Sequence, residues 1–171
     1  MQMVKKISLI LLTVWFALLF FMPKQELYYK LEESLAKQDV RINEQHIDEG
    51  LFSLSLENAD VYVKGIKVAH VKKLTFFTLL FYSEVKVKGV MLEESLKAVA
   101  PRQMDSAVAR YSILSPLEAK VEARGSFGTI AGEVNLSKRI LHLDFIEAKK
   151  IETLKNLLKK GEKGWYYETS F

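Results

Sequence analysis

The chain has 171 residues, of which 49% are hydrophobic and 27% are charged. This length accommodates one ordinary domain with an appendage, and the composition is too apolar for a disordered chain. The formal net charge is +4, but basic and acidic residues alternate along most of the sequence, so nothing indicates a nucleic-acid partner. The absence of cysteine excludes disulfides, thiolate metal sites and cysteine nucleophiles.

The strongest hydrophobic run lies near the N-terminus. Ile7–Met22 contains only Ser8 and Thr13 as polar residues, follows two lysines and precedes a proline. As a helix this run is about 24 Å long, somewhat shorter than the ~30 Å hydrocarbon core of a bilayer, and flanking lysines and local thinning accommodate the difference. We therefore expect residues 1–23 to form a cytoplasmic stub and an uncleaved transmembrane anchor.

Two alternatives to the anchor are a cleaved signal peptide and a buried core helix. Signal cleavage requires a pair of small residues after the apolar run, whereas Ala17 has Trp15 and Leu19 two positions to either side. The two lysines before the run favour an N-terminus on the cytoplasmic side. The sequence therefore predicts a single-pass protein with the bulk of the chain outside the cytoplasm.

Residues 24–39 have the spacing of an amphipathic helix. Leu27, Tyr28, Leu31 and Leu35 recur at helical intervals, with glutamates and lysines between them. We expect this helix to connect the anchor to the domain, to pack on the domain and to set its height above the membrane.

The period changes to that of β-strands from Val40 onward. Apolar and polar residues alternate up to Val63, and a Lys64-Gly65 pair then separates two such runs, which predicts a β-hairpin. Glu84–Val90 resumes the alternation. The intervening segment, Leu74–Tyr82, is either a strand buried on both faces or a strand that ends near residue 77 and turns into a short helical segment.

The C-terminal third gives the clearest β pattern. Residues 117–123, 130–136 and 141–145 alternate, with turns at Gly125–Gly128 and Ser137–Arg139, which predicts three antiparallel strands with one solvated face. Two short helices are also expected, on the apolar spacings of Met104, Ala107, Val108 and Tyr111 and of Ile151, Leu154, Leu157 and Leu158, the second ending at Gly161. Trp165–Phe171 is a candidate closing strand.

These elements predict an α+β fold that is mainly antiparallel β. One N-terminal transmembrane helix is followed by a curved open antiparallel sheet with peripheral helices, and residues 40–171 form one β-rich domain.

The search for catalytic or metal-binding chemistry finds no motif. His46, His70 and His142 lie far apart, with no second ligand at metal spacing, and the neighbours in Asp48-Glu49 and Glu93-Glu94 point to opposite faces of a strand. No nucleophile elbow, phosphate-binding loop or dinucleotide fingerprint occurs. We therefore expect no enzyme activity, no catalytic residue, no metal and no cofactor.

One apolar segment is a candidate binding face. Phe76, Phe77, Leu79, Leu80 and Phe81 belong to the domain core or, if they are not fully buried, line a groove for lipid or a partner protein.

Two stretches of the chain resemble a known family. Ser115–Leu136, with A-R-G-S-F-G-T-I-A-G at its centre, is similar to the C-terminal part of the type II secretion system protein N family, as are the leucine-rich residues 151–160 and the ending Gly161–Tyr167. Leu54–Met91 resembles the strand-and-cover unit of that family and of the larger AsmA-like envelope proteins.

The resemblance implies an inner-membrane protein with a periplasmic β domain, accessory to a machine that exports folded proteins or builds pilus-like filaments. Its partners are then the lipid bilayer, through the N-terminal helix, and other inner-membrane secretion subunits. The alternative is an AsmA-like lipid-binding or lipid-transfer module, whose curved sheet holds phospholipid acyl chains along an apolar inner face.

Overall fold

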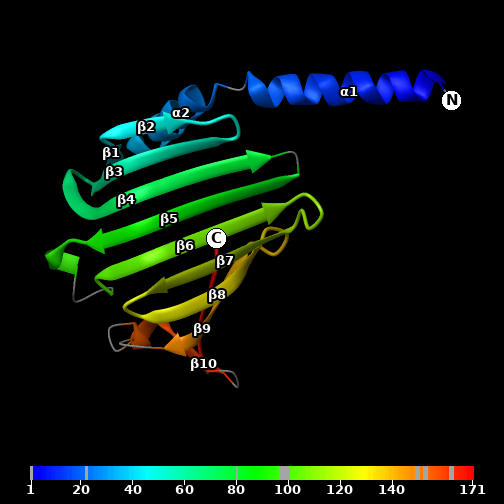
Figure 1. The fold of residues 1–171 in the computed structure, drawn as a ribbon. Coiled ribbons are helices and arrows are strands. Elements are labelled where there is room, and N and C mark those ends of the chain that lie inside the picture. The colour runs from blue at the N-terminus through cyan, green and yellow to red at the C-terminus, as the bar shows by residue number, and fades with distance from the viewer. Residues whose placement is uncertain are drawn as a thin grey trace.

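A computed structural model describes residues 2–21, 23–79, 81–96, 101–148, 151, 154–161 and 164–171. Within them, two α-helices precede a single open sheet of eleven strands in which every pairing is antiparallel (Figure 1). The expected α+β fold, mainly antiparallel and with an open sheet, is therefore confirmed. Among the described residues, no helix has both the length and the apolar character needed to cross a membrane.

The elements have the following bounds. The helices are α1 (Gln2–Phe20) and α2 (Lys24–Ala36), with short 3-10 turns η1 (Glu94–Leu96) and η2 (Lys155–Leu157). The strands are β1 (Val40–Asn43), β2 (His46–Glu49), β3 (Ser53–Val63), β4 (Ile66–Leu79), β5 (Tyr82–Leu92), β6 (Gln103–Ser112), β7 (Glu118–Gly125), β8 (Gly128–Asn135), β9 (Ile140–Ala148), β10 (Lys159–Gly161) and β11 (Gly164–Ser170).

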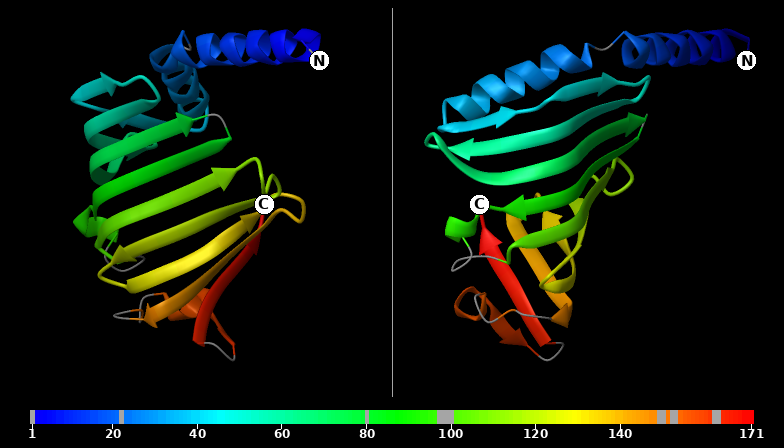
Figure 2. Two further views of the ribbon diagram at one scale, coloured as in Figure 1. Left: turned by 45° about the vertical axis from the view of Figure 1, so that its right-hand side comes forward. Right: turned by 60° about the vertical axis from the view of Figure 1, so that its left-hand side comes forward.

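The sheet follows the chain as a meander. Strands β3 to β9 pair in sequence order, β1 and β2 both pair with β3 at one edge, and β11 and β10 complete the other edge. The sheet is strongly twisted and curved (Figure 2). Tight turns make this topology possible: Lys64 and Gly65 both have positive φ angles, +51° and +78°, as a two-residue type I′ hairpin turn requires.

The two faces of the sheet differ in chemistry. Residues directly opposite each other in an antiparallel pair lie on the same side, so the strand register assigns each side chain to a face. We call the side that α2 covers the inner face. Its residues from β3 to β11 are Leu54, Leu56, Leu74, Phe76, Val85, Val87, Ala107, Ala109, Val121, Ala123, Ile130, Leu143, Phe145 and Tyr167.

The alternate positions form the outer face, which carries most of the charges of the strands. Its residues include Ser55, Glu57, Lys73, Thr75, Glu84, Lys86, Arg110, Glu122, His142 and Glu168. This is the pattern of an antiparallel sheet with one apolar side and one solvated side.

The inner face is covered at its two ends. At the N-terminal end, α2 buries Tyr28 against Leu54 and Leu56. At the C-terminal end, Ile151 closes a cluster with Phe127, Ile130 and Phe145, against which Leu154 and Leu158 on either side of η2 also pack. Each end therefore has its own hydrophobic cluster.

Two helix predictions were wrong. Residues 103–112 form strand β6, in which Ala107 and Ala109 point to the inner face while Val108 points to the outer face. Val108 lies four residues after Met104 and three before Tyr111. This spacing resembles one face of a helix, although Val108 in fact points to the outer face of the sheet.

The predicted C-terminal helix is replaced by the turn η2 and the short strand β10. Residues 152–153 lie outside the described part of the chain. Leu154 and Leu158 still pack on the C-terminal cluster, as the apolar spacing indicated, but β10 pairs with β11 and extends the sheet there instead.

The remaining β predictions are confirmed. Strands β7, β8 and β9 and their turns match the alternation between residues 117 and 145, and β11 matches the expected closing strand. The ambiguous segment from Leu74 stays in β4 up to Leu79, and β5 begins at Tyr82. The short helical segment is therefore wrong, and the strand is not buried on both faces as expected, because Leu74–Phe77 and Leu79 are half-buried while Thr78, Phe81 and Tyr82 are exposed.

Candidate functional site

The middle of the inner face is not fully covered. Valines and alanines of β5, β6 and β7, among them Val85, Val87, Ala107, Ala109 and Val121, are each half-buried. A sheet normally buries its apolar face against another layer. This strip is therefore an apolar surface that the described part of the chain leaves partly open.

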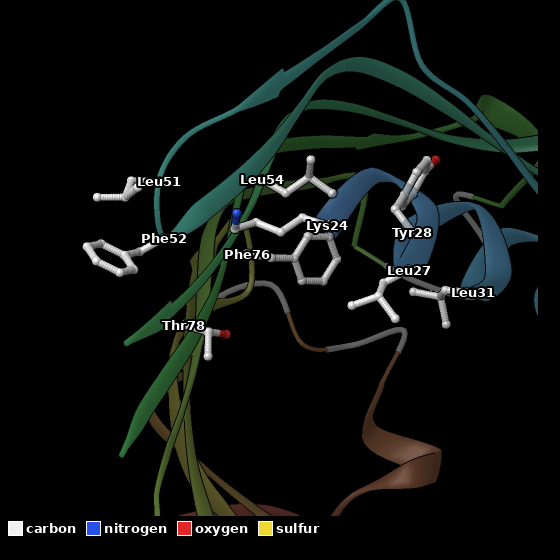
Figure 3. Close-up of a pocket in the computed structure, with 9 residues that line it drawn as sticks. All are labelled: Lys24, Leu27, Tyr28, Leu31, Leu51, Phe52, Leu54, Phe76 and Thr78. Atoms are coloured by element: carbon white, nitrogen blue, oxygen red, sulfur yellow. The ribbon is translucent and has the colours of Figure 1, made fainter. Parts of the chain in front are cut away.

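A pocket lies between α2 and the inner face of β3 and β4 (Figure 3). Its cavity volume is about 190 Å³, which is similar to that of an engineered apolar cavity of ~150 Å³ that binds benzene. The lining residues are Lys24, Leu27, Tyr28, Leu31, Leu51, Phe52, Leu54, Phe76 and Thr78. All but Lys24 and Thr78 are apolar or aromatic, so the pocket suits an aliphatic group.

The pocket is open because several of its walls are exposed. Leu27, Leu31 and Leu51 are 43%, 45% and 48% exposed, while Leu54 at the base is buried. The backbone N–H of Thr78 donates to the carbonyl of Phe52 at 2.8 Å, which keeps the end of β4 beside the start of β3. The walls thus come from α2 on one side and the β3–β4 hairpin on the other.

One cation lies at this pocket. The Lys24 side chain is only 16% exposed, and its Nζ atom donates to Oε1 of Glu49 at a distance of 3.4 Å. An ammonium group has three donors, and within the described residues Glu49 is the one acceptor in contact with it. Lys24 therefore keeps donors for an anionic ligand.

Tyr28 attaches α2 to the sheet. It is buried, and its hydroxyl donates to Oε2 of Glu44 at 2.8 Å. Burial and, after it, the hydrogen bond to Glu44 raise the pKa of Tyr28. Burial and the nearby charge of Glu44 also raise the pKa of Glu32 on the same helix. The carboxylate of Glu44 thus holds one face of α2 against the connection between β1 and β2.

More apolar side chains surround this end of the molecule. Phe81, in the turn between β4 and β5, is 57% exposed, and its ring stacks on that of Trp15 of α1 with 6.4 Å between centroids. Phe21 is 78% exposed and follows α1 directly. The pocket therefore lies at the end of the domain that joins the apolar N-terminal helix.

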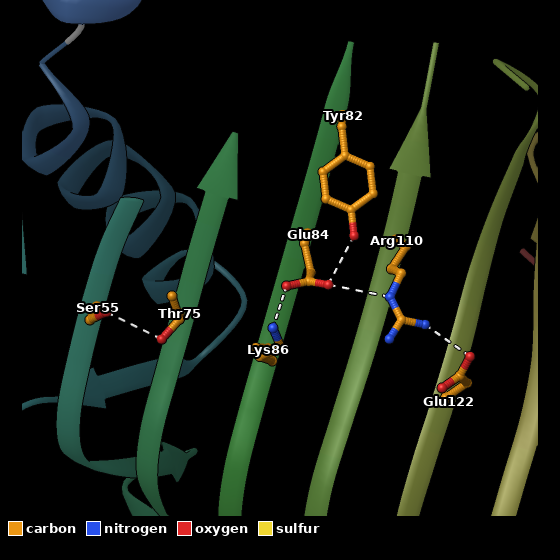
Figure 4. Close-up of polar contacts among 7 residues, drawn as sticks. All are labelled: Ser55, Thr75, Tyr82, Glu84, Lys86, Arg110 and Glu122. Atoms are coloured by element: carbon orange, nitrogen blue, oxygen red, sulfur yellow. Dashed lines mark hydrogen bonds and ion pairs between the residues drawn. The ribbon is translucent and has the colours of Figure 1, made fainter. Parts of the chain in front are cut away.

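The outer face carries a network of ion pairs instead (Figure 4). Glu84 accepts hydrogen bonds from Lys86, Tyr82 and Arg110, and Arg110 also donates to Glu122 at 2.9 Å. Hydrogen bonding from Lys86 and then from Tyr82 lowers the pKa of Glu84. Ser55 and Thr75 share a hydrogen bond of 3.2 Å on the same face. This network pairs charges across strands β5, β6 and β7.

Two of the three histidines, His70 and His142, take part in similar contacts with carboxylates. His70 lies 2.7 Å from Asp60, and His142 lies 3.3 Å from both Asp144 and Glu168. Within the described residues, no three histidine, aspartate or glutamate side chains are arranged to hold a metal ion.

The residues of the predicted apolar binding face do not lie together in the structure. Phe76 lines the pocket, whereas Phe77 lies on the outer face with its ring 6.4 Å from that of Tyr82. Leu79 is half-buried at the end of β4, Phe81 lies in the exposed turn, and Leu80 falls outside the described residues. Of the five predicted residues, Phe76 is thus the one that the described part of the chain places in the pocket.

Sequence reasoning missed the other pocket residues. The signal was the apolar stripe of α2, which includes Leu27 and Leu31, because a helix of this length uses such a stripe to cover another surface. The surface that it covers, formed by Leu54 and Phe76, is far away in the sequence and is identified only by the fold.

Comparison of the chain with protein-family models, with curated proteins and with solved structures finds no match.

Proposed function

We propose that the protein is a non-enzymatic envelope protein, anchored in the inner membrane by α1, that acts as a subunit or assembly factor of a type II secretion or related pilus-like apparatus. Its N-terminus lies in the cytoplasm and its β domain in the periplasm. The observation that carries the anchor is the exposure of α1: Leu9, Ile10 and Leu11 are 64%, 61% and 65% exposed.

Exposed aliphatic side chains at consecutive positions of a helix are unfavourable in water, at about 25 cal/mol for each Å² of apolar surface. A bilayer removes this cost because its hydrocarbon core surrounds the whole helix. Lys5 and Lys6 at one end and Lys24 at the other reach the head groups. The anchor also explains why α1 extends away from the sheet and covers little of it (Figure 1).

The secretion role rests on the resemblance in Ser115–Leu136, the segment that contains strands β7 and β8. A membrane tether raises the effective concentration of the domain for other membrane subunits, so small interfaces suffice for assembly. The open sheet supplies such surfaces on its inner face and at its edges.

The test combines topology with partners. A reporter that is active only outside the cytoplasm, fused to the C-terminus of the full chain, is expected to be active and to remain with the membranes. Crosslinking in secreting cells is expected to capture inner-membrane secretion subunits, and deletion of the chain is expected to reduce export. An inactive reporter contradicts the topology, and export that continues unchanged without the chain contradicts the secretion role.

A second candidate function is favoured by the pocket. The apolar pocket and the half-buried strip beside it are the surfaces that an AsmA-like lipid-binding module needs. Native mass spectrometry of the full chain released from detergent separates the two candidates. Stoichiometric phospholipid favours the lipid module, whereas a lipid-free chain that crosslinks to secretion subunits favours the accessory subunit.

A further inference from the structure

We propose that the pocket between α2 and the β3–β4 hairpin binds one acyl chain of an anionic membrane lipid, whose phosphate lies at the ammonium of Lys24. The inference deepens the lipid-binding candidate and rests on the attachment of the chain to a membrane through α1. It follows from the chemistry of the lining, from the position of Lys24 and from the distance between Lys24 and the apolar helix.

The lining fits the two parts of such a lipid. Leucine and aromatic side chains form the walls, and the cavity of about 190 Å³ accommodates a length of one aliphatic chain but not a whole phospholipid. The charged group of the lining is the Lys24 ammonium, whose side chain is largely buried and which has one carboxylate partner, at 3.4 Å. A cation at an apolar pocket complements an anion that carries a hydrocarbon tail.

The position along the chain agrees with a membrane lipid as the source. Lys24 is the first residue of α2 and follows Phe21, the last apolar residue described before α2, by three positions. Three residues span at most ~11 Å, and the interfacial region on each side of the hydrocarbon core is roughly 5–8 Å thick. With α1 in the bilayer, the Lys24 ammonium is therefore within reach of the lipid phosphates.

The exposed side of the pocket gives an acyl chain a path from the membrane. Leu27, Leu31 and Leu51 are each more than 40% exposed along the wall, and the exposed Phe81 lies in the neighbouring turn beside Trp15 of α1. An acyl chain that enters here covers the exposed leucines and meets Phe76 and Leu54 inside.

The test uses the full chain in vesicles of phosphatidylethanolamine and phosphatidylglycerol. The vesicles contain a phosphatidylglycerol that carries a photoreactive diazirine at the end of one acyl chain. After irradiation, peptide mapping is expected to find adducts on residues 24–31, 51–54 and 76–78 in addition to α1. Adducts confined to α1 overturn the inference while leaving the anchor intact.

A substitution that fills the pocket sharpens the test. Leu31→Trp places a larger side chain at an exposed wall, where the fold tolerates it, and is expected to reduce labelling of β3 and β4 about tenfold without changing the labelling of α1. Leu114→Trp is the matched control, because Leu114 is 88% exposed in the turn after β6. Equal labelling in the two variants contradicts the proposal.

The head group is tested by charge. Lys24→Gln is expected to reduce the preference for labelled phosphatidylglycerol over labelled phosphatidylcholine about fivefold, the factor that corresponds to one lysine at an anionic surface. Lys30→Gln, an equal charge change at an exposed position of the same helix, is expected to keep the preference. If Lys24→Gln leaves this preference unchanged, the result contradicts the placement of the lipid phosphate at Lys24.

Two further readouts separate the alternatives. If the chain does not float with vesicles, the membrane attachment of α1 is contradicted. Labelling by the same probe in detergent micelles then still shows whether the pocket binds an acyl chain. A photoreactive amino acid at Leu51 distinguishes occupants in intact membranes: a lipid-mass adduct supports the inference, and an adduct with a second polypeptide overturns it.

Discussion

The two ends of the inner face cover their apolar residues in different ways. At the C-terminal end, Phe127, Ile130, Phe145 and Ile151 form a buried cluster with further apolar side chains packed around it. At the N-terminal end, α2 buries Tyr28 but leaves a pocket beside it, with three leucines exposed on its walls. The difference indicates that one end has a closed cluster that stabilises the sheet, while the other, next to the apolar helix, leaves apolar surface accessible.

The largest effect on stability is expected from a substitution in the cluster at the C-terminal end. Phe145 is 7% exposed, and Phe145→Ala is expected to lower the free energy of unfolding by about 3–5 kcal/mol, the usual cost of deleting a buried aromatic ring. Denaturant unfolding followed by circular dichroism measures this. Leu114→Ala, at an exposed position, serves as the control and is expected to change the free energy by less than ~0.5 kcal/mol. A similar cost in both variants contradicts a stabilising role for this cluster.

The corresponding truncation at the N-terminal end is expected to cost less. Leu54 is buried but borders the pocket, so Leu54→Ala enlarges an existing opening and is expected to cost about 2 kcal/mol, the lower limit for such truncations. The same unfolding experiment compares the two ends directly. A cost for Leu54→Ala that equals or exceeds that of Phe145→Ala contradicts the distinction between a closed end and an open end.

The strands differ in how well the sequence predicts them. Strands β7 to β9 were predicted because their apolar residues alternate strictly and glycine or polar turns separate them. Strand β6 was missed because two of its inward residues, Ala107 and Ala109, are small and weakly apolar, while Val108 points outward. Strand pairing on both sides of β6, a tertiary effect, decides its conformation.

The pocket could be anticipated only in part. The apolar segment after Leu74 indicated a binding face, but strand alternation sends Phe77 to the outer face and leaves Phe76 in the pocket. The opposite wall comes from α2, and its distance from β4 in the sequence hides the contact. Hydrophobic periodicity identifies which face of an element is apolar, whereas the fold decides which two faces meet.

A smaller effect is expected for the contact that holds α2. Tyr28→Phe removes the hydroxyl that donates to Glu44, and the loss is expected to be about 1–2 kcal/mol because the acceptor is charged. Hydrogen exchange is expected to accelerate in α2 and to stay unchanged in β7–β9. Tyr29→Phe is the matched control, since Tyr29 is 50% exposed on the same helix. Faster exchange at the C-terminal end would contradict the independence of the two ends.

The smallest effect on stability is expected from a substitution of Glu84 on the outer face, and it depends on pH. The pKa of Glu84 is lowered in the folded state, chiefly by the hydrogen bond from Lys86, so its contribution is present at neutral pH and is lost as the pH falls below the ordinary value of 4.5 through the folded pKa. Glu84→Gln is expected to cost about 1 kcal/mol at neutral pH and to flatten the acid dependence of unfolding. Glu118→Gln, at an exposed position of β7, is the control. An unchanged acid dependence in Glu84→Gln contradicts this role.

The attachment of α1 to a membrane is the claim on which the proposed function depends, and alkaline carbonate extraction tests it most directly. Membranes from cells that produce the full chain are washed with carbonate, and the chain is followed by a C-terminal tag. If α1 spans the bilayer, the chain is expected to stay in the membrane pellet, and Leu11→Lys, a charge in the middle of the apolar run, is expected to release it. A wild-type chain that is extracted into the supernatant contradicts the account.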